Sequence, residues 1–177
     1  MTKQRYLRWS SRKALVFCLV HIITTTALAQ APETFTLVHG FIGGSDGGQP
    51  QDGLVRDAAG NLYGTTTIGG GRCNCGTVFK LDSTGNKSVL YSFKGGTDGA
   101  LPVGGVVRDL AGDLYGTTVG GGAPCNCGTV FRLDPNSNEI VMYRFHGGSD
   151  GAAPFAALLR DANGNLYGTT QGWRRLL

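Results

Sequence analysis

The sequence is poor in the side chains and motifs from which catalytic sites are most often built. It contains three histidines, no His-Glu-x-x-His segment, and no glycine-rich loop followed by Lys-Ser or Lys-Thr at phosphate-binding spacing. Hydrolysis needs a nucleophile with a base, or two placed carboxylates. No such set stands out, so we predict no catalytic residue, no metal site and no cofactor.

Charge is also scarce, whereas glycine is abundant. Charged residues make up 16% of the chain, and all 30 glycines lie at or after Gly40. The glycines have no three-residue period, which excludes collagen. Each glycine costs a helix about 1 kcal/mol, and no segment after residue 29 shows an apolar stripe of helical period. An apolar content of 41% argues against simple disorder.

The N-terminal region has the three parts of a secretory signal peptide. Five basic residues precede an apolar run, Ala14 to Ile23, which leads to Ala27-Leu28-Ala29. The run is shorter than the ~20 residues that a membrane-spanning helix needs. We therefore predict a signal peptide over residues 1–29 and export to the periplasm, the cell surface or the extracellular space.

Removal of residues 1–29 would change the net charge from +4 to −1, because five of the sixteen basic residues and none of the twelve acidic ones would leave. No basic patch would remain to hold a phosphate backbone. Nucleic acid is therefore not an expected partner, and we expect instead a glycan or a surface protein.

The rest of the chain is a tandem repeat with a period of 52 residues. Tyr-Gly-Thr-Thr begins at Tyr63, Tyr115 and Tyr167, and residues 53–66 and 105–118 agree at eleven of fourteen positions without a gap. Phenylalanine, proline and Arg-Asp recur at the same spacing, at Phe41/Phe93/Phe145, Pro50/Pro102/Pro154 and Arg56/Arg108/Arg160. The repeat units are placed at about 37–88, 89–140 and 141–172.

Each unit is predicted to form four antiparallel strands, which in the first unit cover 53–57, 61–66, 76–82 and 88–93. The strands are short, and both of their faces carry apolar residues. Sheets of four strands that must be covered on both faces are typical of β-propeller blades. The predicted fold is therefore all-β, a partial β-propeller. A β-solenoid is the alternative.

The strand count is too small for a closed propeller. Residues 36–41 align with a fourth strand, two full units follow, and residues 157–170 supply one hairpin, which gives eleven strands where closure usually needs sixteen. The repeat stops at residues 173–177, so we expect a truncated product or gene fragment, or a chain that associates with copies of itself through uncovered blade edges.

The motifs Gly-Asn-Leu-Tyr-Gly-Thr-Thr, Gly-Thr-Val-Phe-Lys-Leu-Asp, Leu-Tyr-Ser-Phe and Gly-Gly-Ser/Thr-Asp-Gly resemble those of the bacterial GloVer (Gloeo/Verruco) tandem repeat over roughly 35–170. The resemblance implies an exported protein and brings no catalytic residues with it. The hairpin that contains Asn-Leu-Tyr is also similar, more loosely, to those of NHL-like propellers.

Four cysteines form two Cys-Asn-Cys segments, Cys73/Cys75 and Cys125/Cys127. Export favours oxidation, and three pairings are possible. We favour a disulfide within each segment over bridges between units. A zinc site made by all four thiolates would require the two loops to meet.

The remaining repeated polar residues are predicted to be structural. Turns are expected at Asp57/Gly60, Asp109/Gly112 and Asp161/Gly164, because aspartate can accept backbone hydrogen bonds and glycine can take a positive φ. The same reasoning applies to Asp46, Asp98 and Asp150, each of which offers a single carboxylate where calcium wants six to eight oxygens.

The sequence thus favours a non-catalytic exported repeat protein with a structural or interaction role at the cell surface. The alternative is a propeller enzyme, a lyase or hydrolase acting on glycans, since propellers assemble their sites from distant loops. A carboxylate, histidine or tyrosine present in one unit only would indicate the enzyme. His39 and His146, which lie at non-equivalent positions of their units, are the candidates for that role.

Overall fold

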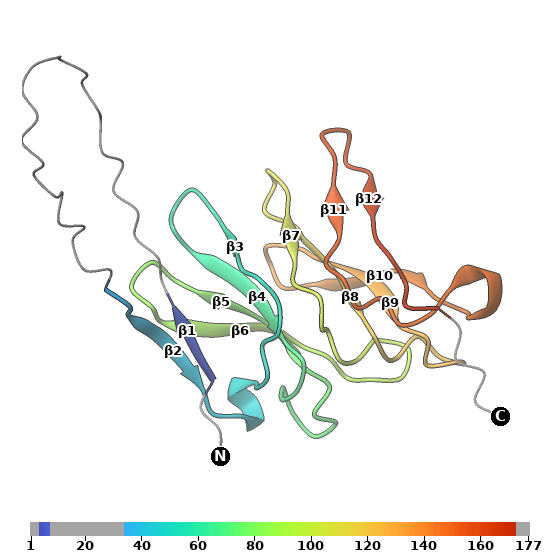
Figure 1. The fold of residues 1–177 in the computed structure, drawn as a ribbon, viewed down its shortest axis with the longest axis horizontal. Coiled ribbons are helices and arrows are strands. Elements are labelled where there is room, and N and C mark those ends of the chain that lie inside the picture. The colour runs from blue at the N-terminus through green and yellow to red at the C-terminus, as the bar shows by residue number, and fades with distance from the viewer. Residues whose placement is uncertain (1–3, 8–33, 173–177) are drawn as a thin grey trace, which may run out of the picture.

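The computed structural model describes residues 4–7 and 34–172, and this part of the chain is built from β-strands and two short 3₁₀ turns (Figure 1). The elements in chain order are β1 (Gln4–Leu7), β2 (Leu37–Phe41), η1 (Gly44–Asp46), β3 (Val55–Arg56), β4 (Leu62–Thr66), β5 (Thr77–Leu81), β6 (Lys87–Ser92), β7 (Val107–Arg108), β8 (Leu114–Thr118), β9 (Thr129–Leu133), β10 (Glu139–Arg144), η2 (Gly148–Asp150), β11 (Leu159–Arg160) and β12 (Leu166–Tyr167). No helix within these residues is long and apolar enough to cross a membrane.

The strands form two sheets of four and two pairs. Sheet one has the order β3-β4-β5-β6 and sheet two the order β7-β8-β9-β10, and every pairing in them is antiparallel. The pairs are β1-β2 and β11-β12. Figure 1 shows these groups following one another across the molecule in chain order. The prediction of an all-β chain with four antiparallel strands per unit is confirmed.

The eleven predicted strands are all present, and β1 is an additional one. β1 lies inside the predicted signal peptide and pairs with β2. The remainder of that peptide and the predicted tail at 173–177 lie outside the described residues.

The core consists of apolar side chains that meet between successive groups of strands. Phe93, Phe131 and Leu133 are buried between sheets one and two, and Phe41 and Phe79 are buried between β2 and sheet one. The ring centroids lie 5.1 Å apart for Phe93 and Phe131 and 4.9 Å apart for Phe41 and Phe79. The 52-residue phenylalanine period is therefore the period of the interfaces between units.

The glycine of the first two Tyr-Gly-Thr-Thr motifs makes room for a phenylalanine ring. A Cβ atom on Gly64 would lie 2.9 Å from Cζ of Phe79, and one on Gly116 would lie 2.6 Å from Cζ of Phe131. We expect such strand glycines to mark the approach of another backbone. The structure places a phenylalanine of the neighbouring strand at both glycines, with Leu54 also beside Gly64 and the backbone carbonyl of Gly105 beside Gly116.

The two threonines of the motif make different hydrogen bonds. The Oγ1 atoms of Thr66 and Thr77 lie 2.7 Å apart within sheet one, and both side chains are buried. Thr65 Oγ1 donates to the carbonyl of Gly104 at 3.1 Å, in the segment that leads to the next unit. One threonine thus links two strands of a sheet, and the other links two units.

A bulge in the last strand of sheet one breaks the predicted alternation of its side chains. Val78 pairs with Tyr91 and Phe79 pairs with Val89, so Leu90 has no partner of its own. Leu90 packs against the core, whereas Val89 is 37% exposed. Strict alternation along 88–93 predicts that Val89, Tyr91 and Phe93 share one face, which is wrong for Val89 because the extra residue of the bulge reverses the alternation.

Candidate functional site at the interfaces between units

The three Gly-Gly-Ser/Thr-Asp-Gly segments each fold into a turn closed by the aspartate. The carboxylates of Asp46, Asp98 and Asp150 accept the backbone N–H of the residue four positions earlier, at 2.9, 2.7 and 2.7 Å. The glycines that flank Asp46 and Asp150 have positive φ values of 77° to 84°. Each aspartate is thus the centre of a turn.

The same carboxylates bind a ring from the residue seven positions earlier. Tyr91 Oη donates to Asp98 at 2.6 Å, Tyr143 Oη donates to Asp150, and His39 Nε2 lies 3.2 Å from Asp46. Burial, and after it the hydrogen bond to Asp98, raises the pKa of Tyr91. The Tyr91 phenol therefore stays protonated and donates to Asp98.

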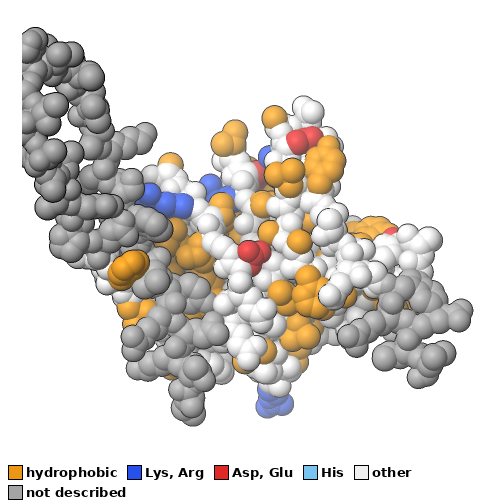
Figure 2. Space-filling model, viewed as in Figure 1, with side chains coloured by type: hydrophobic (Ala, Val, Ile, Leu, Met, Phe, Trp, Pro, Cys, Tyr) orange, Lys and Arg blue, Asp and Glu red, His pale blue; other side chains and the backbone are white. Residues whose placement is uncertain are grey.

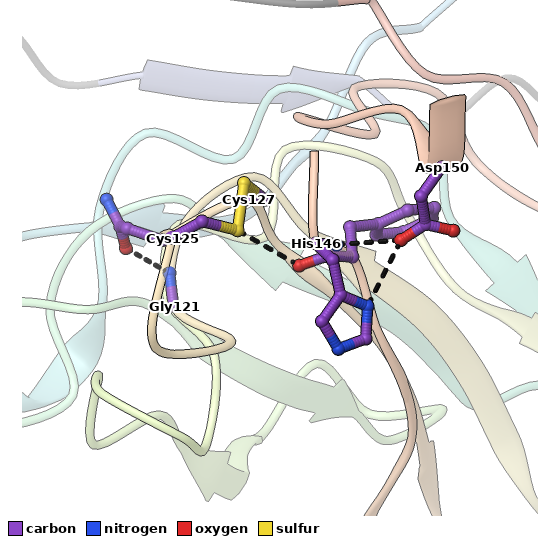
Figure 3. The surroundings of a disulfide bond; sticks show 7 residues. Gly121, Cys125, Cys127, His146 and Asp150 are labelled. Atoms are coloured by element: carbon purple, nitrogen blue, oxygen red, sulfur yellow. Dashed lines mark hydrogen bonds and ion pairs between the residues drawn. A yellow bond between two sulfur atoms is a disulfide. The ribbon is translucent and has the colours of Figure 1, made fainter. Parts of the chain in front are cut away.

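The two candidate histidines both reach these aspartates. His39 is the repeat equivalent of Tyr91, whereas His146 follows Phe145 and places its Nδ1 3.3 Å from Asp150 (Figure 3). Two positions that are not equivalent in the repeat thus serve equivalent carboxylates. Neither histidine binds a hydroxyl that could act as a nucleophile among the contacts of the described residues.

The letters Gly-x-Ser-x-Gly occur around Ser45 and Ser149, a match that sequence reasoning missed. That motif marks a nucleophile when the serine stands on a sharp turn between a strand and a helix. Ser45 and Ser149 lie within η1 and η2, which are turns of three residues, and the nearby histidines contact the following aspartates instead. The match does not form a nucleophile elbow.

The two interfaces differ at one charged position. Lys87 at the start of β6 reaches back 41 residues to Asp46, with Nζ 3.0 Å from Oδ1, and it also binds the Asp46 carbonyl. The lysine side chain is 5% exposed. Burial acts to raise the pKa of Asp46, but the Ile42 amide and Lys87 outweigh it, so that this pKa lies below its ordinary value.

Glu139 occupies the equivalent position at the start of β10 and faces Asp98. Burial, followed by repulsion from and hydrogen bonding with Asp98, raises the pKa of Glu139 to about 7. Lys94 and Arg144 lower it in part. The raised pKa means that the Glu139 carboxyl resists ionisation near neutral pH.

Glu139 is the site residue that sequence reasoning did not single out. The signal was present, because Glu139 is an acid where the preceding unit has Lys87. A carboxylate found in one unit only is the asymmetry that we expect of a catalytic site. Its partner Asp98 had been assigned a turn role alone, and the repeat gives no hint that residues 41 apart meet.

The cysteines are paired within each Cys-Asn-Cys segment, as the sequence favours. Cys73 pairs with Cys75, and Cys125 pairs with Cys127, with a Cα–Cα distance of 5.2 Å in both. Figure 3 shows the second pair. The asparagine between them takes a positive φ, and Asn126 Oδ1 accepts the N–H of Gly121. The alternative zinc site is not formed, since the described residues contain no cluster of three or more metal-binding side chains.

The structure places the predicted hairpin turns between strands. The carboxylate of Asp57 accepts the N–H of Asn61 at 2.8 Å, and Asp161 accepts that of Asn165 at 2.8 Å. The turn glycines Gly60, Gly112 and Gly164 have φ values of 88°, 98° and 89°. Hydrogen bonding by Asn61 is the main cause that lowers the pKa of Asp57 to about 2.

The repeated arginines contact the preceding unit. The guanidinium carbon of Arg108 lies 5.6 Å from the ring centroid of Tyr63, and that of Arg160 lies 5.9 Å from the ring of Tyr115. Tyr63 Oη in turn donates to Asp57 Oδ2 at 3.0 Å. The arginine and the aspartate of one Arg-Asp pair therefore serve different interfaces.

Comparison with known proteins identifies one matching family. Residues 24–174 match the family described as the Gloeobacter/Verrucomicrobia repeat. No curated protein matches the chain.

Proposed function

Because the chain belongs to the Gloeobacter/Verrucomicrobia repeat family, we propose that it is an exported bacterial protein with a structural or interaction role at the cell surface and without catalytic activity. The observation that carries this proposal is the use made of the recurring side chains. The repeated phenylalanines, threonines and arginines contact the neighbouring unit, and the aspartates close turns. Side chains that recur in every unit and contact the next unit are expected in a repeat protein whose role is structural.

Successive units are proposed to be blades of a partial β-propeller. Each complete sheet is a meander of four antiparallel strands, and no strand of sheet one pairs with a strand of sheet two among the described residues. The sheets contact each other through side chains of their faces. A solenoid usually joins its rungs by parallel strand pairing, so this arrangement favours the propeller.

Export is supported by the basic, apolar and Ala-Leu-Ala segments at the N-terminus and by the two paired Cys-Asn-Cys loops. The full chain produced in a bacterium should be recovered outside the cytoplasm with Gln30 as its first residue. Intact mass and N-terminal peptide mass spectrometry measure this. A product that keeps residues 1–29 and stays in the cytoplasm would contradict the proposal.

The binding role is tested by exposing the purified protein to a panel of cell-wall and environmental glycans. We expect retention of a glycan without release of soluble products, as chromatography of the supernatant would show. Product formation would replace the leading proposal by the enzymatic one.

One observation favours that second candidate, an enzyme acting on glycans. Burial and the charge of Asp98 raise the pKa of the Glu139 carboxyl to about 7. A carboxyl group that keeps its proton near neutral pH can serve as the general acid of a glycosidase. If the protein is an enzyme, Glu139→Gln should abolish the release of products. If it only binds glycans, the same variant should retain them as the unchanged chain does.

A further inference from the structure

An arginine stacks on a tyrosine of the preceding unit twice in the structure. Among the three repeated arginines and the three repeated tyrosines, one arginine and one tyrosine take no part in these stacks. Arg108 covers Tyr63 and Arg160 covers Tyr115. Arg56 and Tyr167 are the remaining members of the two series among the described residues. The side chain of Arg56 is exposed, and Tyr167 is 52% exposed, whereas Tyr63 and Tyr115 are half-buried.

The groove at Arg56 has a mixed polar and apolar lining, and apolar side chains are exposed near Tyr167. Arg56 lines a groove of about 520 Å³ together with Leu54 and Leu62, beside β2. At the other end of the repeat, Leu159 of β11 is 68% exposed. Figure 2 shows apolar side chains in the upper right of the described surface, where Figure 1 places β11 and β12.

The strand positions of the two ends do not overlap. β11 and β12 correspond by the 52-residue period to β3 and β4, the first and second strands of a sheet, whereas β2 corresponds to β6, the fourth strand. In that order the first two strands of a preceding unit would lie on the Arg56 side of the groove, separated from β2 by the position of a third strand, where β1 pairs with β2. A segment with the strand positions of β11-β12 would repeat the contact that Tyr63 of sheet one makes with Arg108 of sheet two.

We propose that the groove at Arg56 receives the β11-β12 hairpin of a second copy of this chain, with Tyr167 stacked against Arg56 as Tyr63 is against Arg108. Thr169 would then donate to the backbone near Asp52, because Thr65 and Thr117 make the corresponding bonds to Gly104 and to Pro154 and Ala156. The association is head-to-tail, since each copy offers one end of each kind. It rests on the proposed packing of units as blades.

Sedimentation velocity of the full chain over a range of concentrations tests this association. We expect oligomers that grow with concentration, and we expect Arg56→Ala and Tyr167→Ala each to weaken association by about tenfold, the size of a partly desolvated cation–π contact. Arg72→Ala is the matched control, because Arg72 is also an exposed arginine. It should associate as the unchanged chain does.

Mixing the two variants separates a head-to-tail contact from any other. Arg56→Ala keeps an intact Tyr167 end and Tyr167→Ala keeps an intact Arg56 end, so a mixture should form a dimer of one copy of each and grow no further. An unchanged chain that stays monomeric, or a mixture that does not recover the dimer, would overturn the inference. If circular dichroism shows the same cooperative β-sheet melt in these samples, the proposed function survives that failure.

Discussion

Two interfaces can be compared: the one between β2 and sheet one, and the one between sheets one and two. Their apolar centres are alike, but one charged position holds a lysine in the first and a glutamate in the second. Phe41 meets Phe79 in the first as Phe93 meets Phe131 in the second. At the rim, the first interface joins Lys87 to Asp46, whereas the second joins Glu139 to Asp98. The comparison separates what the repeat needs in order to pack from what it can vary.

The difference shows that burial of rings defines the repeat and that charge modifies it. A buried phenylalanine removes a large apolar area from water in both interfaces. The position shared by Lys87 and Glu139 tolerates either sign, because the neighbouring aspartate is held by its own turn in both units. The first interface is therefore held by an ion pair, and the second carries a carboxyl pair that resists ionisation.

Removing a ring from the shared centre should have the largest effect. Phe131→Ala is expected to lower the free energy of unfolding by about 3–5 kcal/mol, because it opens a cavity in a fully buried site. Phe145→Ala, at a half-buried phenylalanine, should cost about 1 kcal/mol. Urea unfolding followed by circular dichroism measures both, and equal losses would argue against the repeat interface as the core.

Breaking the ion pair should affect the first interface. Lys87→Met is expected to cost about 2 kcal/mol, since it leaves the carboxylate of Asp46 without its buried cation. Lys80→Met is the control, because the Lys80 ammonium lies over the Tyr63 ring and pairs with no carboxylate within the described residues. Thermal melts at pH 7 would compare the two, and an equal loss would show that the pair contributes nothing.

Reversing the charge should make the second interface resemble the first. Glu139→Lys is expected to raise the free energy of unfolding at pH 8 by about 1.5 kcal/mol, because it replaces repulsion with attraction to Asp98. The gain should shrink in 1 M salt, which screens charges at the rim. A variant that is less stable than the unchanged chain at pH 8 would show that Glu139 does not face Asp98 in solution.

Neutralising Glu139 gives the smallest effect and a defined pH dependence. Its folded-state pKa is raised, so ionisation destabilises the fold, and stability is lost as the pH rises from about 4.5 to about 7. Glu139→Gln should therefore equal the unchanged chain at pH 4 and exceed it by about 1 kcal/mol at pH 8, a value reduced for the solvent screening of a half-buried group. Melts across pH 4–8 would measure this, and a constant difference would contradict the assignment.

The sequence predicts the turns of the candidate site, but it does not predict which side chains of different units meet there. The turn role of Asp98 follows from its position between glycines, a local rule that needs no partner. Its contact with Glu139 could not be read in the same way, because nothing local links residues 98 and 139. The exposure of Val89 was missed for a related reason, since the bulge at Leu90 depends on how β6 pairs with β5.

The sequence by itself determined the repeat, the four strands of each unit and the chemistry of the turns, because these depend on side-chain alternation and on backbone angles over a few residues. The tertiary structure decided which units touch, which ring enters the space left by Gly64 or Gly116, and that the same rim position pairs charges in one interface and opposes them in the other. Those outcomes depend on how two folded units pack against each other. The 52-residue spacing alone does not show which charged side chain of one unit lies against the aspartate of another.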